Sequence, residues 1–260
     1  MRTLAPGVWR LEDAPAGPEF VASAHAAGLD AFRIDRPLRW TDFRVLAMDM
    51  DSTLITIECI DEIADYAGVK PQVSAVTAAA MRGELDFPAS LRQRVALLKG
   101  LPESALERVY EERLRLSPGA ETLLAAARAA GLATVLVSGG FTFFTGRLQS
   151  RLGLDHTLAN LLEVEGGRLT GGVLGDIVDA EAKAAKVRSV CAALGCGPER
   201  AIVIGDGAND LRMMAPAGLS VAYHAKPVVR AQAAVSIVHG GPGALRWRFE
   251  DSMDVTPLPH

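Results

Sequence analysis

Five short runs of apolar residues, separated by segments with helical periodicity, constrain the fold of this 260-residue chain more than any other feature. Each run is almost continuously apolar and ends in turn or polar residues; the runs are Val45–Met50, Ala133–Val137, Ala201–Ile204, Leu219–Ala222 and Val235–Val238. Strands that are apolar at every position are typical of a parallel sheet covered on both faces. Their alternation with helices predicts an α/β fold with a doubly wound, Rossmann-like parallel sheet.

The interval between the first and the second run is more than 80 residues long, too long for the usual crossover of such a sheet. Because most of it has helical periodicity, we expect a helical subdomain inserted over residues 56–116. A smaller insertion, residues 161–174, alternates in polarity around two glycines and predicts a β-hairpin. The other expected divisions are an N-terminal appendage (1–43), the α/β core (44–55 and 117–245) and a C-terminal tail (246–260).

Composition excludes several classes of protein. The chain is 49% apolar and 22% charged, which rules out wholesale disorder. Its net charge of −4 argues against a nucleic-acid or anionic-membrane binder, and no apolar run reaches the roughly 18–20 residues that cross a bilayer. The N-terminus lacks the basic-then-apolar order of a secretory signal. The three cysteines form no CxxC pair, so we expect reduced thiols and a cytoplasmic location.

Four polar clusters follow strands or begin helices, which is where open α/β sheets bind ligands. They are Asp49-Met50-Asp51-Ser52-Thr53, Ser138-Gly139-Gly140, Lys183, and the segment from Gly205 to Asp210. Aspartates at such places can simply end strands and cap helices. Asp49, Asp51, Asp206 and Asp210 at one sheet edge would instead crowd four negative charges together, and an all-oxygen ligand set favours Mg²⁺.

Two further features indicate anion binding. The turn Ser138-Gly139-Gly140 offers a hydroxyl and unobstructed backbone N–H groups to phosphate oxygens, although it also fits a plain flexible turn. Lys183 falls on the apolar stripe of its predicted helix, where a lysine needs an anionic partner, whereas Lys186 falls off the centre of that stripe and is expected to be solvated.

In order and spacing, these four clusters resemble the motifs of the haloacid-dehalogenase-type phosphatases, and the helical insertion resembles their cap. Residues 45–240 resemble the phosphoserine phosphatases in particular. The resemblance implies that Asp49 is the nucleophile and that Asp51 is the general acid and base. It implies Mg²⁺ held by Asp49, Asp206 and the backbone carbonyl of Asp51, with Asp210 ordering the water shell of the metal.

The resemblance also implies the groups that bind the substrate. Ser138, Gly139 and Lys183 would hold the transferring oxygens, and Asn209 would contact the substrate or its phosphate. Periodicity places Arg94 inside the apolar arc of its helix, where an arginine either extends to the surface or pairs with an anion in a cleft; the expected crevice favours the anion. In the family this arginine binds a carboxylate, Glu58 binds an ammonium group, and two apolar residues, Met81 and Phe87, line the pocket.

The implied activity is Mg²⁺-dependent hydrolysis of O-phosphoserine, the last step of L-serine synthesis, through an aspartyl-phosphate. One alternative is a related phosphatase or phosphotransferase acting on another small phosphomonoester. A more distant alternative is a phospho-accepting signalling module, which needs neither a long insertion nor an acid at Asp51. The expected partner is a small-molecule substrate, without nucleic acid or membrane. The sequence leaves the oligomeric state open, a homodimer being one alternative, and residues 1–43 are too few for the whole sensing domain of many bacterial relatives.

Overall fold

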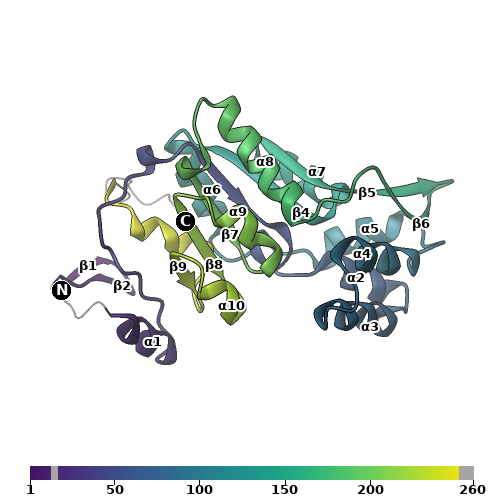
Figure 1. Cartoon of the computed structure of the whole chain (residues 1–260), viewed down its shortest axis with the longest axis horizontal. Coiled ribbons are helices and arrows are strands. Elements are labelled where there is room, and N and C mark those ends of the chain that lie inside the picture. Colours follow the sequence, from purple (N-terminus) through teal and green to yellow (C-terminus); the bar gives the residue numbers. More distant parts are fainter. Residues whose placement is uncertain (13–16, 252–260) are drawn as a thin grey trace.

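The computed structural model describes residues 1–12 and 17–251, which are arranged around a seven-stranded sheet (Figure 1). The strand order is β6-β5-β4-β3-β7-β8-β9, and neighbours are parallel except β5 and β6. The strands are β3 (Val45–Met48), β4 (Ala133–Phe141), β5 (His156–Glu165), β6 (Arg168–Leu174), β7 (Ala201–Gly205), β8 (Leu219–Tyr223) and β9 (Val235–Ile237). The predicted α/β fold is confirmed, and so is the hairpin, which β5 and β6 form.

Helices cover both faces of the sheet, so successive residues of a central strand enter two separate apolar clusters. Val45 and Ala47 of β3 pack in the cluster that contains residues of α8 (Ala180–Ala193), α9 (Leu211–Met214) and α10 (Pro227–Arg230). Leu46 and Met48 pack in the cluster that contains residues of α6 (Ala120–Ala129) and α7 (Thr142–Leu152). This double burial is the reason why the strands are apolar at every position.

Residues 56–116 hold four helices and a π-helical turn: α2 (Cys59–Tyr66), α3 (Lys70–Met81), α4 (Phe87–Ala96), α5 (Ser104–Arg108) and Val109–Arg113. They lie together at one end of the sheet (Figure 1). The chain leaves the core and returns to it at one place, because Ile55 and Leu116 form an antiparallel bridge there. We keep residues 56–116 as the proposed limits of this unit and call it the helical insertion.

The β5–β6 hairpin supports the helical insertion from the side. The N–H of Gly100 donates to the carbonyl of Leu169 (2.7 Å), and the N–H of Leu169 donates to the carbonyl of Leu101 (2.9 Å). At Gly171, a Cβ atom would lie 3.3 Å from backbone atoms of Ala96 in α4, so glycine permits the close approach of the two segments. The insertion is therefore held at its two connections and along β6.

The N-terminal segment contains β1 (Arg2–Ala5), β2 (Val8–Arg10) and α1 (Pro18–Ala26). Its last part is tied to the core, because the carboxylate of Asp30 accepts hydrogen bonds from the N–H groups of Val238, His239 and Gly240. Residues 38–43 go further and contribute buried side chains to the core. The expected appendage is thus anchored at its C-terminal end.

The structure differs from the sequence-based expectation for residues 246–251, which we expected to belong to a tail. Residues 246–248 belong to the 3₁₀ helix Pro242–Arg248. Phe249, which follows, is fully buried and stacked on Trp40, with ring centroids 4.0 Å apart. Burial of two aromatic rings is a strong reason for this segment to join the core. Residues 252–260 lie outside the described residues. Among the described residues, no helix has the length and apolar character that a membrane span requires.

Candidate active site

The predicted site residues gather at the edge of the sheet where β3, β4 and β7 end. Nine of them line one cavity: Asp49, Asp51, Glu58, Phe87, Arg94, Ser138, Gly139, Asp206 and Asn209. Lys183 and Asp210 do not line the cavity, but Lys183 contacts both Asp49 and Asp210. The cavity lies between the sheet edge and the helical insertion, which contributes three of these nine residues.

The turn after β3 presents its two aspartates to the cavity. Asp49 ends the strand, and a π-helical turn over Met50–Leu54 follows, in which Asp51 is extended and Ser52 has a φ of 53°. That left-handed conformation is unusual for a serine and is typical of functional sites. The Ser52 hydroxyl donates to Glu58 (2.6 Å), and the N–H of Cys59 donates to the Asp51 carboxylate (3.1 Å). The turn is therefore joined to the first helix of the insertion.

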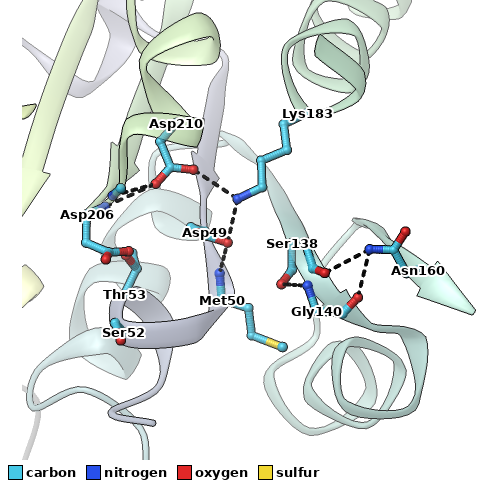
Figure 2. A network of polar contacts seen from close by, with 12 residues as sticks. Asp49, Met50, Ser52, Thr53, Ser138, Gly140, Asn160, Lys183, Asp206 and Asp210 are labelled. Carbon is cyan, nitrogen blue, oxygen red and sulfur yellow. Dashed lines mark hydrogen bonds and ion pairs between the residues drawn. The ribbon is translucent and has the colours of Figure 1, made fainter. Parts of the chain in front are cut away.

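Lys183 lies between two carboxylates in the interior (Figure 2). Its Nζ is 2.8 Å from Oδ1 of Asp49 and 2.9 Å from Oδ1 of Asp210, and its side chain is 1% exposed. Asp210 is fully buried and also accepts hydrogen bonds from the N–H groups of Asp206 and Gly207. As expected, Lys183 faces the core beside an anionic group; in this structure the anions are the carboxylates of Asp49 and Asp210.

The site carries more negative charge than Lys183 balances. Burial, and then Asp210, raise the pKa of Asp49 well above its usual value although Lys183 lowers it. Burial, and then Glu58, raise the pKa of Asp51 to about 7; burial, and then Asp210, raise that of Asp206 to about 6. Burial lowers the pKa of Lys183, but Asp49 and Asp210 outweigh this effect and hold it above its ordinary value.

The acidic residues also have the geometry to hold a cation. One oxygen each of Asp49, Asp206 and Asp210 lies within 4.8 Å of the other two, and Asp206 accepts a hydrogen bond from the buried Thr53 hydroxyl (3.0 Å). Three carboxylates at this separation with a single lysine nearby leave an uncompensated charge that a divalent cation would neutralise. The residues present thus fit a hard cation such as Mg²⁺.

The Ser138-Gly139-Gly140 turn requires its glycines for space. A Cβ atom on Gly140 would lie 2.7 Å from Oδ2 of Asp51, and one on Gly139 would lie 2.8 Å from the ring of Phe87 in the helical insertion. The N–H of Gly140 donates to Oγ of Ser138 (2.8 Å), which leaves the serine proton available for a ligand. The two glycines thus permit the turn to lie directly against Asp51 and Phe87.

Two side chains of the helical insertion give the cavity opposite charges. Arg94 donates weakly to the carbonyl of Ser90 (3.4 Å), burial lowers its pKa, and it forms no ion pair within residues 1–12 and 17–251. Glu58 lines the same cavity as Arg94, and its side chain is exposed to solvent. Met81 does not reach the cavity: it ends α3 with 70% of its surface exposed, so the expectation that it lines the pocket does not hold in this structure.

The comparisons with known proteins agree with this geometry. The profile of the haloacid dehalogenase-like hydrolases matches residues 46–215. The chain belongs to this family. The hydrolase is 57% identical to a phosphoserine phosphatase of Polaromonas sp. strain JS666 over 78% of this chain and 89% of that one. It is 54% identical to a phosphoserine phosphatase of Albidiferax ferrireducens over 88% of this chain and 98% of that one.

A solved structure gives the same result for the fold of the hydrolase. The unliganded crystal structure of a probable phosphoserine phosphatase from Vibrio cholerae has a TM-score of 0.82 and 42% sequence identity. The match covers 93% of this chain and 75% of that one. The likeness therefore includes the helical insertion as well as the sheet.

Sequence reasoning missed several residues of the site of this hydrolase. Asn160 is 1% exposed and donates to backbone carbonyls of the Ser138-Gly139-Gly140 turn. The sequence does contain an indication of this residue, since Asn160 is the one polar side chain in the apolar stretch Leu158–Leu162. Ser52 and Thr53 were part of a recognised cluster, but their contacts with Glu58 and Asp206 depend on the three-dimensional turn.

Proposed function

We propose that this hydrolase converts O-phosphoserine and water to serine and phosphate with the help of Mg²⁺. The observation that carries the proposal is the position of Asp49, which shares one cavity with Asp51 and Asp206 and contacts Lys183. Relatives 57% and 54% identical, both matched over nearly their whole length, are phosphoserine phosphatases. The product is the amino acid itself, so the reaction would complete the synthesis of L-serine.

We assign the attack on phosphorus to Oδ2 of Asp49. Its other oxygen, Oδ1, is held by the N–H of Met50 (2.7 Å) and by Lys183 (2.8 Å), which fixes the direction of the carboxylate. Attack forms a bond between Asp49 and phosphorus and breaks the bond from phosphorus to the serine oxygen. A water molecule then adds to the same phosphorus, which releases phosphate and restores the carboxylate.

Asp51 is the proton carrier in this scheme. Its pKa of about 7, raised by burial and by Glu58, keeps a proton available for the serine oxygen as it leaves. After that transfer, the Asp51 carboxylate accepts the proton of the attacking water. The hydrogen bond from the N–H of Cys59 to Oδ1 holds the carboxyl group in place, and Oδ2 faces Gly140 of the phosphate-binding turn.

We propose that Asp49, Asp206 and the backbone carbonyl of Asp51 hold Mg²⁺, with Asp210 behind them. Mg²⁺ bound there would supply positive charge that shields the nucleophile from the negative phosphoryl group. The protein itself supplies Lys183, Ser138 and the N–H of Gly139 to the phosphoryl oxygens, since the N–H of Gly140 donates to Ser138. Support for the cation comes from the close approach of the three carboxylates and from the charge they leave unbalanced.

Arg94 and Glu58 are the groups that we assign to the amino-acid part of the substrate. A guanidinium group suits a carboxylate because it can donate two parallel hydrogen bonds, and Glu58 suits an ammonium group. Asn209 lies on the wall of the cavity beside Asp206 and is assigned to the phosphate or the substrate. This pairing of opposite charges distinguishes a zwitterionic substrate from a simple phosphomonoester.

Phosphate release from a panel of phosphomonoesters tests the proposal. O-phosphoserine should be the preferred substrate, EDTA should abolish turnover and Mg²⁺ should restore it. Asp49→Asn should be inactive, whereas Asp176→Asn, an exposed residue on the loop before α8, should match the wild type. Phosphate release by Asp49→Asn at a wild-type rate would refute the assigned nucleophile, and equal rates on all esters would refute the substrate.

We also propose a cytoplasmic location, supported by three cysteines that are all free. The oligomeric state, for which a homodimer is one alternative, is measured directly by light scattering of the purified protein.

A further inference from the structure

Asn160, in β5, makes three hydrogen bonds with its side-chain amide, and those to the glycine turn are drawn in Figure 2. Nδ2 donates to the carbonyl of Gly139 (2.8 Å) and, at longer distance, to that of Gly140 (3.3 Å). Oδ1 accepts from the N–H of Val178 (2.8 Å). Because the residue is only 1% exposed, these contacts are made in the protein interior, where their geometry is held by the packing around them.

The amide occupies a place where the β4–β5 ladder is interrupted. Val137 is paired with Leu158 and Phe141 with Asn160, so β4 advances four residues where β5 advances two. The segment Ser138–Gly140 therefore bulges out of the regular ladder. The side-chain N–H groups of Asn160 donate to carbonyls of this bulge, and these hydrogen bonds replace the ladder hydrogen bonds that the bulge lacks.

The three hydrogen bonds connect two parts of the candidate site that hold the phosphoryl group. One part is the turn with Ser138 and the N–H of Gly139. The other is α8, because Val178 immediately precedes Asp179, the residue that caps this helix, and Lys183 follows in its first turn. A change at Asn160 would thus alter the position of the turn relative to Lys183.

We propose that Asn160 is a positioning residue for phosphoryl transfer: its amide sets the glycine turn at the distance from Lys183 that the transferring oxygens require. The inference rests on the proposed phosphatase function. A side chain that acts in this way contributes more in the transition state, when phosphorus has five oxygen neighbours, than in the bound substrate. Its effect therefore falls on kcat and on the binding of a transition-state mimic more than on KM.

A matched control exists at the opposite end of the same strand pair. Thr134 of β4 is also 1% exposed, and its hydroxyl donates to the carboxylate of Asp155 (2.8 Å), just before β5. Thr134→Val removes two part-buried hydrogen bonds between β4 and the residue before β5, because the hydroxyl also accepts from the N–H of Asp155 (3.1 Å). It reports what the loss of side-chain hydrogen bonds on the same strand does to stability alone.

The test compares Asn160→Ala and Asn160→Asp with Thr134→Val and the wild type. Asn160→Asp has nearly the same shape and keeps the acceptor for Val178 but replaces the donor group, so it serves if the alanine variant does not fold. For each protein we would measure kcat, KM for O-phosphoserine, the inhibition constant of orthovanadate, which mimics five-coordinate phosphorus, and the thermal midpoint. All assays are run well below the lowest midpoint.

Both Asn160 variants should lose about 100-fold in kcat, and the inhibition constant of orthovanadate should rise by a similar factor, while KM changes less than about threefold. Thr134→Val should lower the midpoint and leave kcat and orthovanadate inhibition unchanged. The inference is overturned if the folded Asn160 variants keep the kcat and orthovanadate inhibition of Thr134→Val. A wild-type protein that does not hydrolyse O-phosphoserine refutes the proposed function instead, so the two failures are distinguishable.

Discussion

Replacement of Lys183 by methionine tests the electrostatic account of the site. Methionine has a similar length and no charge, so Lys183→Met removes the cation between Asp49 and Asp210 and leaves the packing nearly intact. The lysine is 1% exposed, and both ion pairs are shorter than 3 Å. Its loss leaves two neighbouring buried carboxylates without the positive charge that lies between them.

The size of the effect follows from this burial. Removal of one partner from a buried ion pair typically costs about 3–5 kcal/mol. For a chain of this size 1 kcal/mol shifts the thermal midpoint by about 2–4 °C, so we expect a loss of about 10 °C without metal at neutral pH. The loss should shrink at acidic pH, because Asp49, whose pKa is already raised by burial and by Asp210, then binds a proton in the folded state.

The assay is thermal unfolding followed by circular dichroism in EDTA, at about pH 7.5 and again at about pH 5. Lys186→Met, three residues along α8, is the control, since it belongs to no ion pair among the described residues. Added Mg²⁺ should restore part of the stability of Lys183→Met without restoring turnover. If Lys183→Met and Lys186→Met unfold at the same temperature in EDTA at neutral pH, the reasoning is refuted.

Three other measurements test separate parts of the site. The thermal midpoint of the metal-free protein should fall from about pH 5 to 8, and Mg²⁺ should reverse the fall. Burial raises the pKa of Asp206 to about 6 and that of Asp51 to about 7, so the folded state binds more protons than the unfolded state and loses stability as these protons leave. A midpoint that does not change with pH would contradict this. Arg94→Ala should raise KM for O-phosphoserine at least about tenfold but not KM for phosphoethanolamine, which has no carboxylate, and an equal loss on both would remove the assignment. Ser52→Ala removes the hydrogen bond that the serine hydroxyl donates to Glu58, and it should raise KM for O-phosphoserine about threefold to tenfold. KM for phosphoglycolate, which has no amine, should not change. The same rise in KM for both esters would exclude a role of Ser52 through Glu58.

The parts of the fold that were predicted correctly from sequence are those in which one physical cause acts on many neighbouring residues. Burial on both faces makes every residue of β3 and β7 apolar, and this pattern can be read directly from the chain. Lys183 was predicted to face an anion because a charge on an apolar stripe needs a partner, and two carboxylates lie there. In both cases the local pattern and the tertiary environment agree.

The parts that were missed depend on contacts between distant segments. Phe249 joins the core because Trp40, more than 200 residues earlier, offers a ring for stacking, and no local pattern reports such a partner. Asn160 lies in β5, and its side chain contacts carbonyls of a bulge in another strand and the N–H of Val178 on the segment before α8. Met81 was assigned to the pocket by resemblance alone, and the direction of a side chain at a helix end is not encoded by periodicity.

The bridge between Ile55 and Leu116 makes the lid of this enzyme removable in principle. Since the two residues face each other as neighbours in an antiparallel pair, a tight turn of about two residues could join them and bypass everything between. A minimal protein of this kind would keep Asp49, Lys183, Asp206 and Asp210 but lose Arg94, the residue that we propose binds the carboxylate of the substrate. Because the insertion also contacts β6, a different insertion joined at the same junction would have to fit Leu169 and Gly171 as well.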